Sequence, residues 1–410
     1  MKISEKIREM MQRVTQKVRT GNPVDSTASI QRTLKNTLPP NQLLDQNAMP
    51  CFMRKRQADS PFLPHLRTPD GLAGFVPELL AGLGIATPQG GAGFAGPAFK
   101  PQPRQQDTQT HTDTESGGQF VSKSYSNHAG TRSYKLYIPG SYHGQALPLV
   151  VMLHGCTQNP DDFAAGTGMN ALAENEQCFV AYPCQAQSAN VSKCWNWFSA
   201  VDQEREKGEP SIIAGITREI IQDYAVDQHR VFIAGLSAGG AMAVIMGTSY
   251  PDLYAAVGVH SGLPFASAHD LPSALSAMKG GMGRATAKQR QKGIPVIVFH
   301  GDQDKTVHPS NGDQVMAQSM RSSGARTSSA SVEVQQGKVP NGHAYTRTIH
   351  HDEIGPAIAE QWLVHGAGHA WSGGSKRGSY TDANGPDATR EMMRFFSTHS
   401  HPEKNEEAPI

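Results

Sequence analysis

The fold is decided by RVFIAGLSAGGAMAVIMGTSY, residues 230–250. The run VFIA is typical of a strand that is buried on both faces, and AMAVIMGTSY predicts a helix. Between the two lies GLSAG (235–239), a G-x-S-x-G motif at a strand-to-helix turn. In this position the motif indicates a nucleophile elbow, whose glycines leave room for a sharp turn and for a substrate. We therefore expect Ser237 to be a catalytic nucleophile.

The same two kinds of segment continue on both sides of this stretch. Further buried-strand runs are LPLVVMLHG, CFVAYP, AAVGVHSG, IPVIVFHG and AEQWLVHG. SIIAGITREIIQDYAV has helical period, and GPDATREMMRFFSTH predicts a last helix capped near Asp387. YSNHAGTRSYKLYIP alternates around a turn and predicts a hairpin. Strands and helices that alternate over residues 119–398 predict an α/β domain with a mostly parallel sheet.

A nucleophilic serine needs a base, and the base needs a carboxylate that orients it. In hydrolases with this elbow, the carboxylate and then the histidine follow the serine along the chain. His369 lies in a Gly-rich loop after a strand, whereas His365 and His300 lie inside or at the end of strands and more readily pack. Asp302 and Asp304 share a tight turn and cannot both face the histidine. We expect His369 as the base and Asp304 as its partner.

The negative charge that develops during acyl transfer needs two N–H donors. One should be the N–H of Ala238, the residue after the nucleophile. The other should be the N–H of Cys156, in the loop after LPLVVMLH. Since a backbone donor needs no particular side chain, Cys156 can fill this role and also be a small residue in a tight turn.

Three tryptophans lie beside these loops. Trp195 and Trp197 belong to CWNWF, and Trp371 follows the expected base by two residues. Each can line a groove for the acyl chain or pack between loop and sheet. We expect Trp371 to be a wall of the groove and Trp195 to be a packing residue.

The cysteines are too few for a disulfide scaffold, and their number, five, is odd. Reduced, buried thiols are the first expectation, and a disulfide, Cys156–Cys194 or Cys184–Cys194, is the alternative. Cys51 has no evident partner. The chain contains no C-x-x-C and no H-E-x-x-H, so we expect neither a metal nor a cofactor.

Several motifs together resemble one family. HGCTQ (154–158), CWNW (194–197), GLSAGG (235–240), HGDQD (300–304) and GHAW (368–371) are similar to those of the polyhydroxybutyrate (PHB) depolymerase family of esterases. The tail GSYTDANGPDATREMMRFF also looks like theirs, and the resemblance covers about residues 120–398. It implies an α/β-hydrolase fold with a Ser–Asp–His triad, carried here by Ser237, Asp304 and His369. The family also includes feruloyl and acetylxylan esterases.

Three other segments frame the expected esterase domain. Residues 1–56 are basic and have apolar residues at helical spacing, which predicts a helical segment that docks on a partner or on the main domain, with a membrane surface or a polymer-granule surface as the alternative. Residues 57–118 are rich in Pro and Gly and predict a linker that lacks secondary structure from about residue 86 onward. Residues 399–410 are expected to be a tail.

Composition excludes some classes of function. With 37 Lys+Arg and 36 Asp+Glu, the formal net charge is +1, so no global field attracts nucleic acid or an anionic membrane. No apolar run is long enough to predict a transmembrane helix. The start, MKISEKIREMMQRV, has no apolar h-region, so we expect a cytoplasmic location, with secretion by another route left open.

These patterns predict a serine esterase that hydrolyses short-chain 3-hydroxyalkanoate esters, as PHB or its oligomers. One alternative is a feruloyl or acetylxylan esterase that acts on carbohydrate-linked esters. Another is a granule-binding or scaffold protein whose hydrolase domain is idle. The complete order of serine, aspartate and histidine argues against an idle domain.

Overall fold

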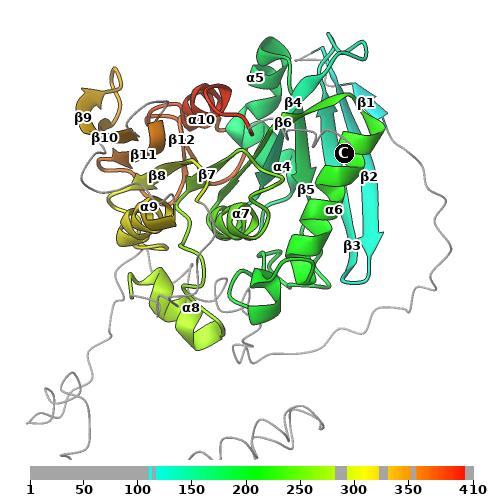
Figure 1. Cartoon of the computed structure of the whole chain (residues 1–410). Helices are drawn as coiled ribbons and strands as arrows, with labels where there is room; N and C mark the ends of the chain where they lie inside the picture. Colours follow the sequence, from blue (N-terminus) through cyan, green and yellow to red (C-terminus); the bar gives the residue numbers. More distant parts are fainter. Residues whose placement is uncertain (1–109, 113–116, 282–292, 323–330, 352–356, 402–410) are drawn as a thin grey trace, which may run out of the picture. The chain divides into compact units, whose positions relative to one another are not determined.

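An eleven-stranded sheet carries the part of the chain that the computed structural model describes, residues 110–112, 117–281, 293–322, 331–351 and 357–401. The spatial order of its strands is β1-β2-β3-β5-β4-β6-β7-β8-β11-β10-β9 (Figure 1). The strands are β1 Thr110–Thr112, β2 Gln119–Asn127, β3 Gly130–Ile138, β4 Leu147–Leu153, β5 Phe179–Pro183, β6 Val226–Leu236, β7 Ala256–His260, β8 Val296–Gly301, β9 Ser331–Lys338, β10 Ala344–His351 and β11 Ala357–Val364. Two short strands, β12 Trp371–Ser372 and β13 Thr381–Asp382, pair apart from the main sheet.

The middle of the sheet is parallel and its two ends are antiparallel. Strands β5, β4, β6, β7, β8 and β11 pair in parallel. At one end, β2 and β3 form the predicted hairpin, with Asn127 opposite Gly130 at its turn. At the other end, β9 and β10 form a hairpin that the sequence patterns did not predict.

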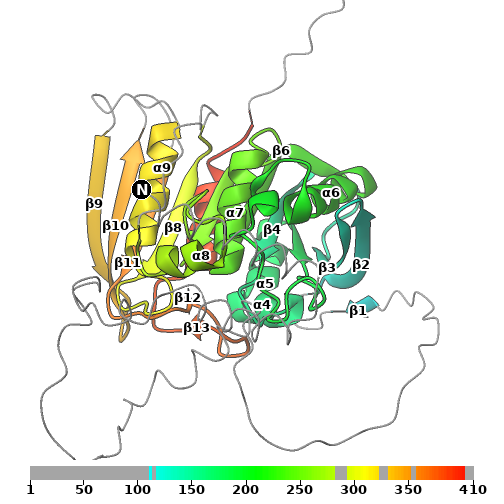
Figure 2. The ribbon, with the colours of Figure 1, turned by 90° about the horizontal axis from the view of Figure 1, so that it is seen from below.

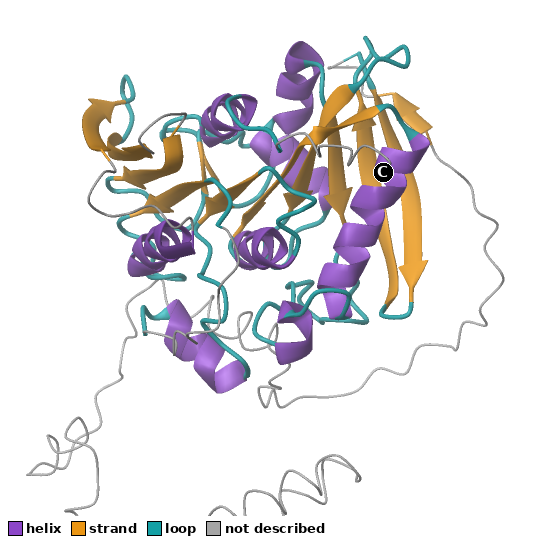
Figure 3. Cartoon of the chain, in the orientation of Figure 1, coloured by secondary structure: helices purple, strands orange, loops and turns teal. Residues whose placement is uncertain are grey.

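Helices cover both faces of this sheet (Figure 3). They are α4 Pro160–Thr167, α5 Met169–Glu176, the 3-10 turn η3 Ala200–Gln203, α6 Gly208–Asp223, α7 Ala238–Ser249, α8 Leu271–Met278, α9 Ser310–Ser322 and α10 Ala388–Ser397. Residues of α6, α7, α8 and α9 belong to one hydrophobic core, and residues of α4, α5 and α10 belong to the other. The domain therefore has the three layers of the predicted α/β domain with a mostly parallel sheet, as the α/β-hydrolase fold implied by the family resemblance requires.

Strand β4 shows why the central runs are apolar throughout. Leu149 and Val151 enter the core that α6 and α7 cover, while Val150 and Met152 enter the opposite core. Because successive side chains of a strand point to opposite faces, a strand covered on both sides needs apolar residues at every position. The continuous run LPLVVML is the sequence signature of that double burial.

Strand β1 lies inside the segment that we expected to be a linker, so that prediction is wrong for these residues. Residues 86–117 were expected to lack secondary structure, but Thr110–Thr112 pairs antiparallel with the start of β2, Thr110 opposite Val121. An edge strand offers free backbone N–H and C=O groups to any neighbouring extended segment. Pairing of this kind depends on backbone hydrogen bonds, so a polar stretch such as Thr-His-Thr can join without an apolar pattern.

The parallel arrangement brings the predicted catalytic segments together. Loops at the carboxyl ends of β4, β6, β8 and β11 carry residues 154–158, Ser237, residues 302–304 and residues 365–369. Carboxyl ends of parallel strands meet at one edge of the sheet, where open α/β sheets bind their ligands. Figure 2 shows β12 and β13 beside α4 at one end of the strands, and the N–H of Ser375, between these two strands, donates to the carbonyl of Gly166 in α4.

The chain divides into two units, Met1–Arg67 and Thr68–Ile410. All described residues belong to the second unit. The expected helical segment 1–56, Cys51 and most of the expected linker and tail lie outside the described residues. Within the described ranges, no helix has both the length and the apolar character that a membrane span requires.

Candidate active site

Ser237 occupies a strained turn between β6 and α7. Its φ is 58° and its ψ is −119°, a backbone conformation that is rare for a residue with a side chain. A Cβ added at Gly235 would collide with the backbone of Gly239, and one added at Gly239 would collide with the carbonyl of Leu153. The G-x-S-x-G pattern is therefore a packing requirement of the turn, which presents Ser237 at the N-terminus of α7.

The expected carboxylate and base are in contact. His369 Nδ1 lies 2.7 Å from Asp304 Oδ2, and Asp304 is 4% exposed. The N–H groups of Thr306 and Val307 both donate to the other carboxylate oxygen at 2.9 Å. These donors fix the carboxylate so that it faces the imidazole, and His369 is held by its Nδ1 with Nε2 available for a second partner.

Asp304 is held in its ionised form. Burial alone would raise the pKa of its carboxyl, but hydrogen bonding to His300 and His369 outweighs burial and holds the pKa well below its usual range. His300 is fully buried at the end of β8. Its Nε2 lies 3.4 Å from Oδ2 of Asp304 and 2.8 Å from the carbonyl oxygen of Val307. His300 therefore supports the loop that carries the carboxylate.

Asp302 has a different partner. Its Oδ2 lies 3.0 Å from Nδ1 of His365, and its Oδ1 accepts the N–H of Gly366 at 2.7 Å. The Nε2 of His365 lies 2.9 Å from the hydroxyl of Thr346 on β10. The two aspartates of the HGDQD turn thus face two different histidines, and only Asp304 faces His369.

The loop after β4 is held by the imidazole of His154, whose hydrogen-bond partners determine which ring nitrogen carries the proton. The N–H of Gln185 donates to Nε2 of His154 at 3.1 Å, so the proton of this ring is on Nδ1, from which it is donated to the carbonyl of Gly155 at 2.8 Å. Burial lowers the pKa of His154 to about 4, so the ring stays neutral. Because C=O and N–H point in opposite directions across a trans peptide, the N–H of Cys156 faces away from His154.

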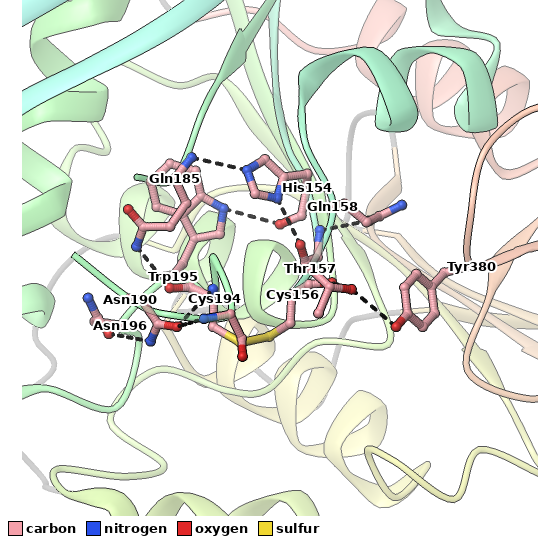
Figure 4. The surroundings of a disulfide bond; sticks show 12 residues. His154, Cys156, Thr157, Gln158, Gln185, Asn190, Cys194, Trp195, Asn196 and Tyr380 are labelled. Atoms are coloured by element: carbon pink, nitrogen blue, oxygen red, sulfur yellow. Dashed lines mark hydrogen bonds between the residues drawn. A yellow bond between two sulfur atoms is a disulfide. The ribbon is translucent and has the colours of Figure 1, made fainter. Parts of the chain in front are cut away.

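A disulfide ties this loop to the CWNW segment. Cys156 is bonded to Cys194 (Figure 4), so the first expectation of reduced thiols is wrong for these two residues, and the pairing is the first of the two alternatives. Cys178 and Cys184 are free. The indole N–H of Trp195 donates to the carbonyl of His154 at 3.1 Å, which makes a second link between the same two segments.

A buried carboxylate holds the CWNW segment from the other side. Glu209, at the start of α6, is 4% exposed and accepts the backbone N–H of Asn196 at 2.7 Å and its side-chain amide at 2.8 Å. Arg132 donates to it at 3.3 Å and Gln185 at 2.5 Å. Burial and the neighbouring Asp202 carboxyl raise the pKa of Glu209 to about 7.

One pocket collects most of the predicted site residues. Its lining includes Ser237, His369, Cys156, Ala238 and Trp197. Ala238 is the first residue of α7, so its N–H has no acceptor within the helix. Both expected oxyanion donors therefore border the same space as the expected nucleophile and the expected base.

The three tryptophans separate into different roles. Trp197 lines the pocket with Phe198, and their rings pack edge to face with centroids 5.6 Å apart. Trp371, which we expected to be the wall, is 1% exposed: its indole N–H donates to Thr389 at 2.9 Å and its ring stacks on His260. That expectation is corrected, because Trp371 turns away from the pocket into the core. Trp195 is fully buried as well.

Tyr380 and Thr157 are pocket residues that the sequence patterns did not single out. Tyr380 reaches the pocket from the loop before β13, and its hydroxyl lies 3.2 Å from that of Thr157 (Figure 4). The only signal for Tyr380 in the sequence was its place in the tail GSYTDANGPDATREMMRFF. Among the described residues, no group of three or more His, Cys, Asp or Glu side chains could hold a metal ion.

Comparisons with known proteins find esterases among the relatives of this chain. A family model described as Esterase PHB depolymerase matches residues 132–336, half of the chain. Poly(3-hydroxyalkanoate) depolymerase C from Paucimonas lemoignei is 32% identical over 193 residues, which are 44% of this chain and 46% of that protein. Probable acetylxylan esterase A from Aspergillus fumigatus is 29% identical over 210 residues, 47% of this chain and 55% of that protein. The chain thus spans about half the length of the curated relatives it matches.

A solved structure shows the same fold. It is that of the acetyl xylan esterase from Aspergillus awamori, which aligns with a TM-score of 0.50 at 19% identity and covers 71% of this chain and 99% of its own.

Proposed function

Because the chain belongs to the PHB depolymerase family of esterases, we propose that it is a serine esterase that hydrolyses short-chain 3-hydroxyalkanoate esters through an acyl-enzyme. The observation that carries the proposal is the Asp304–His369 hydrogen bond beside a pocket that Ser237 also lines. An oriented imidazole and a hydroxyl that border one space are the parts that nucleophilic catalysis needs.

The reaction uses these groups in sequence. Ser237 Oγ attacks the ester carbonyl while His369 Nε2 takes its proton, and the ionised Asp304 stabilises the imidazolium that forms. The N–H groups of Cys156 and Ala238 bind the oxyanion. His369 then gives the proton to the departing alcohol, and a water molecule, activated by the same imidazole, releases the acid.

The first experiment tests the reaction class. The purified chain should hydrolyse p-nitrophenyl butyrate, and Ser237→Ala and His369→Ala should each lower kcat by a factor on the order of 10⁴–10⁶. Equal hydrolysis by wild type and Ser237→Ala would overturn the serine mechanism. No hydrolysis by wild type would favour a granule-binding or scaffold protein with an idle domain.

The second experiment tests the substrate. A carbohydrate-linked ester is the other candidate, since the curated relatives include an acetylxylan esterase as well as a poly(3-hydroxyalkanoate) depolymerase. We propose the hydroxyalkanoate ester because the relative of higher identity is the depolymerase. A panel of hydroxybutyrate oligomers, amorphous PHB and acetylated or feruloylated sugars decides by kcat/KM, and a preference for the sugar esters would overturn the choice.

The disulfide bears on the compartment. Bonds between cysteines persist in oxidising compartments and are rare in the cytosol, so Cys156–Cys194 argues against the cytoplasmic location that the first residues suggested. We propose that the esterase domain works where thiols are oxidised. Alkylation of the protein directly on cell lysis, followed by mass measurement, should leave these two cysteines unmodified. Their complete alkylation would support the cytoplasm.

A further inference from the structure

The hydroxyl of Tyr380 lies at the pocket and forms a hydrogen bond with the hydroxyl of Thr157. Thr157 Oγ1 donates to the carbonyl of Cys156 at 2.6 Å and lies 3.2 Å from the Tyr380 hydroxyl. A threonine hydroxyl has one proton, and the shorter contact takes it. Tyr380 must therefore donate to Thr157, which leaves the Tyr380 oxygen with lone pairs and no proton for a ligand.

The backbone at Tyr380 and at the residue before it is held by several hydrogen bonds. Its carbonyl accepts the N–H of Trp371 at 2.7 Å. The preceding residue, Ser379, donates its N–H to Asp162 at 2.8 Å, and the carbonyl of Ser379 accepts from Gln158 at 3.1 Å. Three elements of the site loops thus fix the backbone next to the ring.

The backbone of Tyr380 is also strained. Its φ is 53°, which is an outlier for a bulky residue and is energetically unfavourable. Strain of this kind persists only where the surrounding structure imposes it. A smaller or more flexible residue would fit the turn at lower cost, so the strain is a reason to assign the ring and its hydroxyl a task at the pocket.

We propose that Tyr380 is a specificity-determining residue that accepts a hydrogen bond from a hydroxyl group of the substrate. Its position beside Thr157, and so beside the oxyanion donor Cys156, places this acceptor close to the ester group. A site that offers an acceptor favours a hydroxyl over a hydrogen and over a keto group, because a keto group has no proton to donate. The inference rests on the proposed esterase function and narrows its substrate to hydroxylated esters.

Three ethyl esters test the acyl part of the substrate. Wild type should prefer ethyl 3-hydroxybutyrate to ethyl butyrate and to ethyl 3-oxobutyrate in kcat/KM. Tyr380→Phe keeps the ring and removes the oxygen, so the ratio of 3-hydroxybutyrate to butyrate should fall by about fivefold to tenfold. Tyr345→Phe, a tyrosine on β10 outside the pocket lining, is the matched control and should leave the ratio within about twofold.

A second variant reverses the direction of donation. Thr157→Val removes the acceptor of the Tyr380 proton, which then becomes available to a ligand. The ratio of kcat/KM for ethyl 3-oxobutyrate to kcat/KM for ethyl butyrate should therefore be higher in Thr157→Val than in wild type. The substrate hydroxyl can also belong to the alcohol part of the ester. In that case Tyr380→Phe lowers the ratio of kcat/KM for 2-hydroxyethyl acetate to kcat/KM for ethyl acetate, and the ratio for the acyl pair stays unchanged.

The outcomes separate the two proposals. If wild type hydrolyses none of these esters, the proposed function falls and this inference falls with it. If wild type hydrolyses them and Tyr380→Phe changes neither ratio by more than about twofold, the inference alone is overturned. Equal losses on hydroxylated and plain esters would also overturn it, because Tyr380 would then only position the Thr157 loop.

Discussion

Asp304 Oδ2 and His369 Nδ1 lie 2.7 Å apart although 65 residues separate them in the chain, whereas Asp302, two residues before Asp304, contacts His365. The turn after β8 therefore sends its two carboxylates to two different imidazoles. One pair borders the pocket through His369 and the other lies outside its lining.

This divergence predicts unequal effects of two similar substitutions. Asp304→Asn removes the charge that stabilises the imidazolium and should lower kcat on p-nitrophenyl butyrate about 10⁴-fold. Asp302→Asn, the matched control in the same turn, should change kcat by less than about threefold, because its partner does not line the pocket. Steady-state kinetics of both variants, with circular dichroism to show that both fold, would refute the assignment if Asp302→Asn had the larger effect.

The Cys156–Cys194 disulfide should stabilise the folded domain. It closes a segment with a sequence separation of 38, for which the chain-entropy estimate is about 4 kcal/mol. Urea unfolding with and without dithiothreitol should show a loss of this order for wild type. Cys184→Ser, which removes a free cysteine, should respond as wild type does, and the double variant Cys156→Ala/Cys194→Ala should not respond to the reductant at all.

Trp197 and Trp371 should differ in what their removal affects. Trp197 lines the pocket, so Trp197→Leu should raise KM several-fold with a smaller change in kcat, as expected for a wall that binds ground state and transition state alike. Trp371 is buried, and Trp371→Ala should lower the free energy of unfolding by about 3–5 kcal/mol. A raised KM for Trp371→Ala at temperatures where it is fully folded would argue against this division.

Glu209 should make stability depend on pH. Its pKa is raised from 4.5 to about 7 in the folded state, so its contribution to stability is fully present below pH 4.5 and is lost as pH rises through 7. As pH rises over this range, the unfolding free energy of wild type should therefore fall by on the order of 3 kcal/mol relative to that of Glu209→Gln.

The control for Glu209 is Glu204→Gln, whose carboxylate is exposed on the surface. Its curve of unfolding free energy against pH should run parallel to that of wild type. If Glu209→Gln also ran parallel to wild type across the interval from its ordinary pKa of 4.5 to its raised pKa of about 7, the buried carboxyl would not be the titrating group.

The sequence contained enough to predict the central layers. Strands β4, β5 and β7 and the second half of β6 are apolar at nearly every position because both faces are covered. Helix α10 begins at the predicted cap, where Asp387 accepts the N–H of Arg390. The β9–β10 hairpin was missed because β9, SVEVQQGK, has no buried residue; its two apolar side chains on one face, Val332 and Val334, are both more than half exposed. Burial leaves a pattern in sequence, and an exposed edge strand does not.

The pocket walls were harder to predict than its chemistry. Trp371 is two residues from His369, but proximity along the chain says nothing about side-chain direction, and the start of β12 turns the indole toward Thr389. Tyr380 reaches Thr157 from 223 residues away, a contact that only the folded loops create. The motif residues follow from local turns after strands, whereas the wall depends on how separate loops cross.

The positive φ of Ser237 has a consequence for how this position would change if hydrolysis were no longer under selection. A residue with a Cβ at φ 58° costs about 1 kcal/mol or more relative to glycine, so the folded chain would tolerate Ser237→Gly and even become more stable by it. Under the proposed function, it is the reaction that keeps a serine at this position. A descendant that no longer needed hydrolysis would drift toward glycine at this position, and such a glycine would mark the loss of the enzyme while every strand and helix around it stayed intact.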